Sequence, residues 1–385
     1  MTILHLVQRP QLRGAEMFTA QLASHTMRSG HKAMIVFVYG GKAQLPFTGN
    51  IFHLNSRKWK RFADVGAWRK LANIIRQEKP DIIQANAGDT LKVAVLSKLL
   101  FRWKQPIIFR NASTLSLYIK SAAARKFNGF FFRHAAGIVS VCQASAYDFA
   151  RLYPQLNNRI VTIPVGIEYT DDACEALPKA ANEHPVLVHV GGFTFEKNHV
   201  RLISMFERIV QKLPTARLQL IGDGPLREEM VQVVYKKGLQ QLVEFFGSRN
   251  DALHFIAKAD VLLLPSIIEG LPAVIPEAFC CGTPVVAYDV GGVGELVADY
   301  ETGRLLRKGD EAGFVDAVLW TLSDKEAVRR MVENARRLVT TEYLNYRLAW
   351  RFAELYRSLI DEHTNHHHEN YKSYKWKLQN QQQDV

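Results

Sequence analysis

Residues 259–289 read ADVLLLPSIIEGLPAVIPEAFCCGTPVVAYD, and this stretch decides the fold. Val261–Leu264 is a short apolar run of the kind that buried parallel strands show. Val274–Cys281 is compact and apolar, and the glycine and proline that follow it are stop signals for a short helix. Val285–Tyr288 is again apolar and rich in β-branched residues. The stretch therefore predicts a strand, a glycine-containing loop, a helix and a second strand, as in a doubly wound parallel sheet.

Two carboxylates stand at the predicted loop and helix start, Glu269 and Glu277. In a strand-loop-helix unit, this loop and the helix N-terminus face a crevice where anions bind. A carboxylate repels a phosphate, but it accepts hydrogen bonds from hydroxyl groups, as acidic residues do with ribose. Backbone donors for a phosphate, combined with carboxylates for hydroxyls, suit a nucleotide sugar.

The segment Glu269-Gly-Leu-Pro, followed by Glu277-Ala-Phe-Cys-Cys-Gly-Thr-Pro-Val-Val, resembles the donor signature of the family 4 retaining glycosyltransferases, which have the GT-B fold. Further motifs follow in the family's pattern, at Gly222–Pro225, Phe246–Ser248 and Gly291–Glu295. An isolated pair of glutamates would usually be solvated, whereas four ordered motifs argue against chance. The resemblance implies an α/β protein with two Rossmann-like, doubly wound domains that face a central cleft, and a C-terminal helix that crosses back to the first domain.

The resemblance also implies roles for individual residues. In this family, two glutamates separated by seven residues contact the donor sugar and the ribose, which here would be Glu269 and Glu277. Most relatives hold the donor diphosphate with an arginine at the position of Gly192 and a lysine five positions later; this chain keeps Lys197 but lacks the arginine, which Arg13 could replace. Relatives hold the base through backbone contacts after the strand that ends near Phe246. The implied donor-binding residues are Gly191, Gly192, Lys197, Gly222, Gly224, Ser248, Arg249, Asn250, Glu269, Gly270, Leu271, Pro272, Ala273 and Glu277, and the implied catalytic residues are Lys197, Glu269 and Asp89.

The composition is that of a globular protein with room for two cores. The chain has 385 residues, of which 48% are hydrophobic and 22% charged. No apolar run reaches the roughly 18 residues needed to span a bilayer, and the chain enters its first apolar run without the features of a signal peptide. The four cysteines have no metal-ligand spacing. We therefore expect a cytoplasmic protein that needs no metal and no cofactor, with the nucleotide sugar as its substrate.

The charge is distributed unevenly along the chain. Residues 1–165 hold 24 Lys and Arg against 6 Asp and Glu, a net charge of +18, although the whole chain carries only +12. Basic residues alternate with aromatic ones at residues 57–62, 100–104 and 125–133. Each cluster taken alone is equally compatible with amphipathic helices that bury their aromatic side chains. Together the clusters favour peripheral contact with the anionic inner face of the cytoplasmic membrane. Nucleic acid is the other anionic candidate, but we expect no such partner because no nucleic-acid module is recognisable.

The order of motifs predicts the domain organisation. We expect an acceptor-binding domain over residues 1–166, a donor-binding domain over 167–345, a crossover helix over 346–362 and a polar tail over 363–385. Strands of the first domain are expected at residues 3–7, 32–39, 51–54, 81–85, 106–110, 137–141 and 160–164. Strands of the second domain are expected near residues 186–190, 218–221, 243–246, 261–264 and 285–288.

Polar clusters at strand ends of the first domain are candidates for the acceptor site. A Gly-Ala-Glu loop after the first strand lines the cleft in the family, although Gly14 would also fit an ordinary tight turn. Asp89 could accept a proton from an acceptor hydroxyl or cap a helix. Asn86 falls where the family often has a histidine. The predicted acceptor-binding residues are Arg9, Arg13, Gly14, Asn86, Asp89, Arg110 and Asn111.

The sequence thus predicts a metal-independent retaining glycosyltransferase. It would move a sugar from a nucleotide-diphosphate sugar to a glycan or lipid-linked acceptor in cell-envelope polysaccharide synthesis. Two alternatives stay open: a non-catalytic nucleotide-binding scaffold of GT-B fold, which the glycine at position 192 favours, and a GT-B nucleotide-sugar epimerase. A dehydrogenase is disfavoured because no Gly-x-Gly-x-x-Gly follows the first strand.

Overall fold

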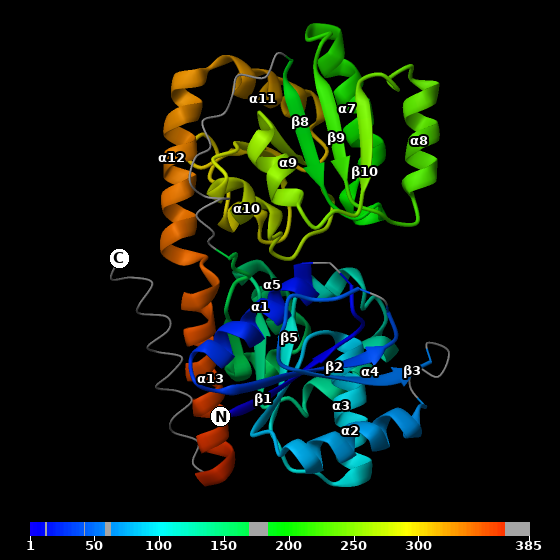
Figure 1. Ribbon diagram of the computed structural model, residues 1–385, viewed down its shortest axis with the longest axis vertical. Coiled ribbons are helices and arrows are strands. Elements are labelled where there is room, and N and C mark those ends of the chain that lie inside the picture. The colour runs from blue at the N-terminus through cyan, green and yellow to red at the C-terminus, as the bar shows by residue number, and fades with distance from the viewer. Residues whose placement is uncertain (12–13, 42, 58–62, 169–183, 366–385) are drawn as a thin grey trace. The chain divides into compact units, whose positions relative to one another are not determined.

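The computed structural model describes residues 1–11, 14–41, 43–57, 63–168 and 184–365. These residues form two compact units: Met1–Val165 with the described chain from Asn345 onward, and Gly166–Leu344. Each unit is a parallel sheet with helices packed around it (Figure 1). Some of the predictions concern residues outside the described ranges. These residues are Arg13, residues 58–62 of the first basic-aromatic cluster, residues 169–183 and the tail beyond Asn365.

The first unit contains a seven-stranded sheet in the order β3-β2-β1-β4-β5-β6-β7, in which every neighbouring pair is parallel. The chain builds the sheet outward from β1 in both directions, as a doubly wound sheet requires. The predicted strands of this half are all present. Their bounds are β1 Thr2–Val7, β2 Lys32–Tyr39, β3 Asn50–Ser56, β4 Ile82–Ala85, β5 Ile107–Asn111, β6 Gly137–Ser140 and β7 Ile160–Thr162.

Five helices of the first unit connect these strands, and a sixth, α13, reaches the sheet from the end of the described chain. They are α1 Gly14–Arg28, α2 Val65–Glu78, α3 Gly88–Phe101, α4 Ala122–Phe132, α5 Gln143–Leu152 and α13 Asn345–Asn365. The last helix, α13, returns to this unit and packs beside α1, where the Phe18 and Phe352 rings lie 6.1 Å apart. The hydroxyl of Tyr356 donates to Gln84 Oε1 at 2.6 Å, which ties α13 to the end of β4.

The second unit contains a six-stranded parallel sheet in the order β10-β9-β8-β11-β12-β13. Its strands are β8 Val186–Val190, β9 Arg217–Ile221, β10 Val243–Gly247, β11 Val261–Leu264, β12 Val285–Asp289 and β13 Arg304–Arg307. Its helices are α7 His199–Lys212, α8 Arg227–Lys236, α9 Ala252–Lys258, α10 Val274–Cys280, α11 Glu311–Ser323 and α12 Lys325–Glu342. This strand order is that of a Rossmann sheet.

Residues 259–289 form the elements that their sequence predicts. It forms β11, a loop, α10 and β12, and the two strands pair in parallel with Leu262 opposite Val285. All four residues of β11 are buried, as expected for a strand covered on both faces. Across the described residues, no helix is both long and apolar enough to cross a membrane.

Candidate donor-binding site

The second sheet has its topological switch point between β8 and β11. These strands are neighbours, but the chain leaves β8 toward β9 and leaves β11 toward β12, on the other side. The loops that follow the two strands therefore part from each other and leave a crevice at the carboxyl ends, which is where ligands bind in sheets of this kind. Residues 191–198 and 265–273 form these loops.

Backbone contacts join the two loops at the switch point. Lys197 ends a single 3-10 turn, Phe195–Lys197, and Asn198 follows with a φ of 59°. The side chain of Asn198 donates to the carbonyl of Pro265 at 3.0 Å, and the backbone N–H of Ile267 donates to the carbonyl of Glu196 at 2.8 Å. The loop after β8 is thus held against the loop after β11, and this sets the distance between their side chains.

The structure brings together Lys197 and Glu269, two of the residues predicted to be catalytic. Lys197 Nζ donates to Glu269 Oε1 at 2.6 Å, and the two side chains are only 21% and 9% exposed. A hydrogen bond between two charged groups is stronger than a neutral one. Because an ammonium group has three donors, Lys197 can keep this bond and still donate to a further anion in the crevice.

The glycine motif after β12 supports the Glu269 loop from behind. Gly291 has a φ of 58°, and a Cβ at this position would lie 2.1 Å from the carbonyl oxygen of Glu269. The backbone N–H of Gly292 donates to the carbonyl of Gly270 at 2.7 Å. No residue with a side chain could keep this backbone so close, so the motif Gly291–Glu295 has a structural reason: it positions Glu269.

A second set of glycines packs the loops after β8 and β9 together. Gly222 has a φ of 140°, and a Cβ there would lie 2.0 Å from the carbonyl oxygen of Gly191. A Cβ at Gly224 would lie 2.6 Å from the carbonyl oxygen of Phe193. Gly192 differs from these positions, because a Cβ there would meet its nearest neighbour, the carbonyl oxygen of Asp223, at 3.4 Å, an ordinary contact. The backbone therefore does not require a glycine at position 192.

Glu277, the predicted ribose ligand, lies in α10 and is half-buried. Burial raises the pKa of its carboxyl group to about 7. Within the described part of the chain, no donor pairs with this carboxylate. A half-buried carboxylate without a donor among the described residues favours hydroxyl groups as partners, because each hydroxyl supplies a hydrogen bond without a charge of its own.

The loop after β10 holds the residues predicted to contact the base. Ser248, Arg249 and Asn250 are all exposed. The guanidinium of Arg249 makes two hydrogen bonds to the carboxylate of Asp251, at 2.8 and 2.7 Å, which raise the pKa of Arg249. This side chain is therefore engaged locally, and a contact with the base would have to come from the backbone. That role stays a prediction.

Two buried histidines beneath the Lys197 loop were not given a role by the sequence. His199 stacks on Phe193 with ring centroids 4.1 Å apart, and the His189 ring meets His199 edge-on at 4.7 Å. Burial lowers the pKa of His189 to about 4 and that of His199 to about 2, so both are neutral. The only signal in the sequence was a histidine two positions after the lysine, which by itself indicates nothing.

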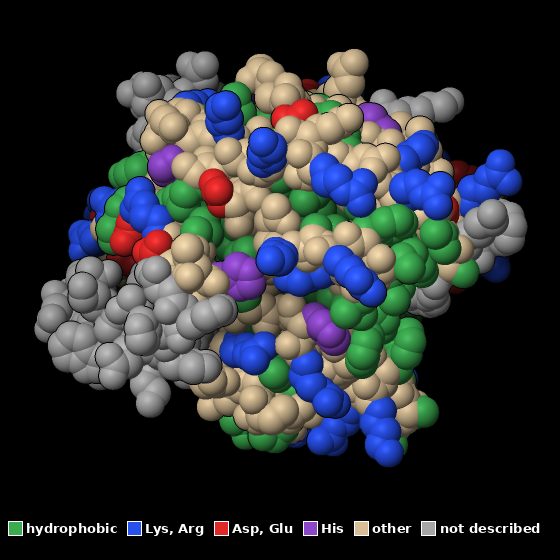
Figure 2. All heavy atoms as spheres, turned by 90° about the horizontal axis from the view of Figure 1, so that it is seen from below, with side chains coloured by type: hydrophobic (Ala, Val, Ile, Leu, Met, Phe, Trp, Pro, Cys, Tyr) green, Lys and Arg blue, Asp and Glu red, His purple; other side chains and the backbone are tan. Residues whose placement is uncertain are grey.

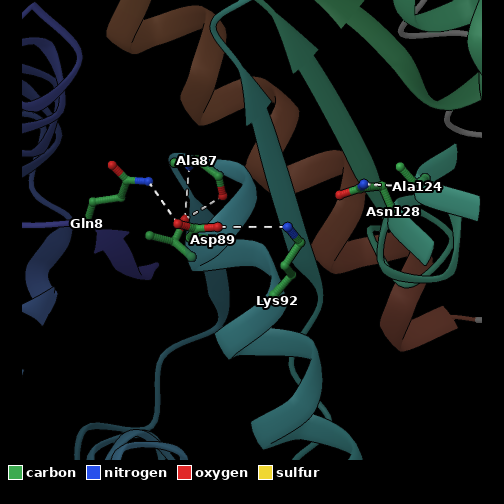
Figure 3. Close-up of polar contacts among 7 residues, drawn as sticks. Gln8, Ala87, Asp89, Lys92, Ala124 and Asn128 are labelled. Carbon is green, nitrogen blue, oxygen red and sulfur yellow. Dashed lines mark hydrogen bonds and ion pairs between the residues drawn. The ribbon is translucent and has the colours of Figure 1, made fainter. Parts of the chain in front are cut away.

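In the first unit, the predicted acceptor residues at the end of β4 are held by internal contacts. The amide of Asn86 accepts from Gln84 Nε2 at 2.9 Å and donates to the carbonyl of Leu6 at 3.3 Å. Asp89 points toward Gln8 and Lys92, whose nitrogens lie 3.5 and 3.8 Å from its carboxylate (Figure 3). The N-cap of α3 is Ala87, so the alternative role of Asp89 as helix cap is wrong; this carboxylate lies in the first turn instead.

Arg110 and Asn111, at the end of β5, are buried inside the first unit, each 1% exposed. The guanidinium of Arg110 lies over the Phe18 ring at 4.5 Å, and its nitrogens have no hydrogen-bond partner among the described residues. Burial lowers the pKa of Arg110 to about 10. Asn111 Nδ2 lies 3.5 Å from both Ser140 Oγ and the carbonyl of Ser145. Neither side chain reaches the surface, and their role toward an acceptor stays a prediction.

The predicted loop after β1 ends earlier than expected. Gly14 is exposed and is the first residue of α1, and its φ is not positive. It is therefore not the glycine of a tight turn, as the alternative interpretation had it. Arg9 is half-buried before this helix. No group of three or more histidine, cysteine or acidic side chains able to hold a metal occurs within the described ranges.

Comparisons with known proteins place this chain in a family. The model of "Glycosyltransferase Family 4" matches residues 12–171, and that of "Glycosyl transferases group 1" matches residues 176–338. Together they account for both units, and the chain belongs to the family 4 glycosyltransferases.

Among the curated relatives is the N-acetyl-alpha-D-glucosaminyl L-malate synthase of Bacillus anthracis, 29% identical over 47% of this chain and 47% of the relative. Another is the 2-deoxystreptamine N-acetyl-D-glucosaminyltransferase of Streptomyces fradiae, 32% identical over 53% of this chain and 51% of the relative. The match thus spans about half the length of these relatives.

The fold resembles that of HepE from Anabaena, solved in complex with UDP-glucose. The TM-score is 0.78 at 22% sequence identity, and the comparison covers 93% of this chain and 100% of HepE. The two Rossmann-like units are thus those of the GT-B fold.

Proposed function

We propose that the protein is a glycosyltransferase that moves a sugar from a nucleotide-diphosphate sugar to an acceptor hydroxyl, with retention of the anomeric configuration and without a metal ion. The observation that carries this proposal is the pair Lys197–Glu269, held at the switch point of a Rossmann sheet with Glu277 in the helix that follows. A cation for a phosphate and two carboxylates for hydroxyls are what a nucleotide sugar needs.

The proposed chemistry places a different demand on each residue. The bond between the anomeric carbon and the diphosphate oxygen breaks, and negative charge develops on the leaving phosphate. Lys197 stabilises this charge, together with the backbone N–H groups of Leu271 and Ala273, which donate to no other described residue. Preorganised donors of this kind contribute about 3–4 kcal/mol each in comparable sites. Glu269 orients the sugar hydroxyls, and Glu277 binds the ribose.

The donor is proposed to be a UDP-sugar. HepE was solved with UDP-glucose, and the names of both curated relatives contain an N-acetylglucosaminyl group. We propose that the acceptor is a glycan or a lipid-linked glycan of cell-envelope polysaccharide synthesis, and that Asp89 takes up the proton of its hydroxyl.

Peripheral contact with an anionic membrane accompanies this proposal. It rests on the net charge of +18 in residues 1–165. The surface supports this proposal. The face in Figure 2 carries many Lys and Arg side chains and few Asp or Glu, with hydrophobic side chains between them. Such a face favours an anionic lipid surface, and it would hold the protein where lipid-linked acceptors are made.

The proposal is tested by incubating the protein with UDP-glucose or UDP-N-acetylglucosamine and a set of lipid-linked glycans, with EDTA present. We expect UDP release that depends on the acceptor, and a product whose anomeric configuration, read by NMR, equals that of the donor. Lys197→Ala should lower the rate about 100- to 1000-fold, while the exposed Lys236→Ala should not change it. UDP release without any acceptor, accompanied by a changed sugar, would instead identify the epimerase.

A further inference from the structure

A groove of about 520 Å³ runs along α4 in the first unit, next to the end of α5. Gly129 and Tyr153 form its floor: a Cβ at Gly129 would lie 3.0 Å from the Tyr153 ring, so a glycine lets the ring pack against the helix. The hydroxyl of Tyr153 donates to the carbonyl of Arg125 at 3.1 Å, which fixes the ring. The groove is thus built into the packing of the unit.

Four cations line this groove, and none of its lining residues carries a carboxylate. They are Lys120, Arg125, Lys126 and Arg133. Within the described residues, none of these four side chains makes an ion pair or a hydrogen bond. Exposed arginines on α12 of the second unit provide a contrast, because Arg329 and Arg330 both form ion pairs with glutamates of the same helix. Four unpaired cations around one groove repel one another, and an anion would relieve that repulsion.

Exposed aromatic side chains lie beside the cations. Arg125, Gly129 and Arg133 repeat every four residues and face the groove, and Lys126 and Phe130 form the adjacent stripe of the helix. Phe130 is 44% exposed and Phe127 is 47% exposed. Both rings rest edge-on against the buried Phe131, at 5.2 and 5.1 Å. Cations beside outward-facing phenylalanines are typical of helices that lie at a membrane interface.

We propose that this groove binds the headgroup phosphate of an anionic phospholipid, while Phe127 and Phe130 enter the acyl boundary of the membrane. The inference rests on the membrane contact proposed above and assigns it to one site. Two observations carry it: the groove collects positive charge that no described residue pairs with, and exposed phenylalanine side chains stand beside it on α4. A phosphate diester matches the first, and a hydrocarbon layer matches the second.

The test is cosedimentation of the full chain with vesicles of phosphatidylcholine, with and without phosphatidylglycerol. Wild type should bind only the anionic vesicles. Arg125→Gln/Lys126→Gln should bind about 30-fold more weakly, since each basic residue near the surface contributes about 1 kcal/mol. The matched control is Arg69→Gln/Lys70→Gln, which removes two exposed charges from α2 of the same unit. It should bind within a few-fold of wild type. Phe127→Ser/Phe130→Ser should also bind weakly, whereas Tyr147→Ser, at the most exposed aromatic side chain among the described residues of the unit, should bind as wild type does.

Several results would overturn the inference. One is an equal loss in the α2 control, which would mean that net charge alone drives binding. Another is retention of anionic-vesicle binding by both groove variants. Tight binding of wild type to a single-stranded oligonucleotide or to inorganic pyrophosphate, with no preference for anionic vesicles, would assign the cations to another phosphate source.

The inference and the proposed function can fail separately. The proposed UDP site belongs to the second unit, so the groove variants should bind UDP as wild type does. The groove variants could bind anionic vesicles weakly, as expected, while wild type transfers no sugar to any acceptor. That result would support the lipid-binding groove and overturn the glycosyltransferase proposal.

Discussion

The strand ends of the two sheets carry polar residues in different ways. In the second unit, the polar residues lie in loops beyond the strands, and backbone contacts between these loops bring Lys197 and Glu269 within 2.6 Å. In the first unit, Arg110 and Asn111 belong to β5 itself and are buried. A residue just beyond a strand is free to face a ligand, whereas one within a strand of a doubly covered sheet faces the core. This difference explains why the sequence pointed to the candidate donor site of the second unit more directly than to an acceptor site in the first unit.

The largest effect that tests this comparison is expected for Gly291→Ala. The added Cβ would lie 2.1 Å from the carbonyl of Glu269, so the Glu269 loop must move. The matched control is Gly238→Ala, because Gly238 also has a positive φ, 67°, but has no atom within 4 Å of the added Cβ. Both variants bear a backbone strain of about 1–3 kcal/mol. Only Gly291→Ala should also lose UDP-sugar binding, measured by titration calorimetry. Equal binding by the two variants would show that Gly291 does not position the site.

The next effect concerns the interior of the first unit. Asn86→Ala should lower the free energy of unfolding by about 1–3 kcal/mol, because the buried amide nitrogen of Gln84, which donates to Asn86 Oδ1 at 2.9 Å, would lose this acceptor. Asn73→Ala, on the exposed surface of α2, is the control and should change it little. Urea denaturation measures both. If Asn86→Ala instead keeps its stability and raises the KM for the acceptor, Asn86 contacts the acceptor and the comparison is wrong.

Gly192→Arg is expected to have a smaller effect, and to strengthen UDP binding rather than weaken it. The backbone at this position accepts a side chain, and the family resemblance implies an arginine here that holds the diphosphate. We expect about tenfold tighter UDP binding, corresponding to one added hydrogen bond between charged groups. Gly192→Ala serves as the control and should bind as wild type. Weaker binding by Gly192→Arg alone would mean that another cation already occupies this place.

The smallest effect is a change in the pH dependence of stability. Burial raises the pKa of Glu277 to about 7 in the folded protein, while the unfolded chain has the ordinary value of about 4.3. The folded state therefore binds more protons between these values, and the contribution of Glu277 to stability falls as the pH rises from about 4 to about 7. Glu277→Gln should remove that loss, and the exposed Glu229→Gln should not. Thermal unfolding at several pH values measures it; identical profiles for wild type and Glu277→Gln would contradict the raised pKa.

The sequence predicted the sheets well because buried parallel strands are short, apolar and separated by helices, as β11 and β12 are. It also singled out Lys197, Glu269 and the motif that contains Gly291, since these motifs depend on spacing along a single loop or turn; the roles of Lys197 and Glu269 toward a donor stay predictions. It could not show that Asn86 and Arg110 face inward, because a polar residue after an apolar run is compatible with either direction. Nor could it find His189 and His199, which meet only through the packing of β8 against α7.

The central claim is that the switch point of the second unit binds a nucleotide sugar through Lys197, Glu269 and Glu277. The most direct measurement is titration calorimetry of UDP-glucose, UDP and GDP with wild type, Lys197→Ala, Glu269→Gln and Glu277→Gln. We predict that wild type binds a single nucleotide class, that Lys197→Ala weakens binding of the diphosphate itself, and that Glu269→Gln weakens UDP-glucose but not UDP. Binding that is equal in wild type and all three variants, or absent from the folded wild type, would contradict the account.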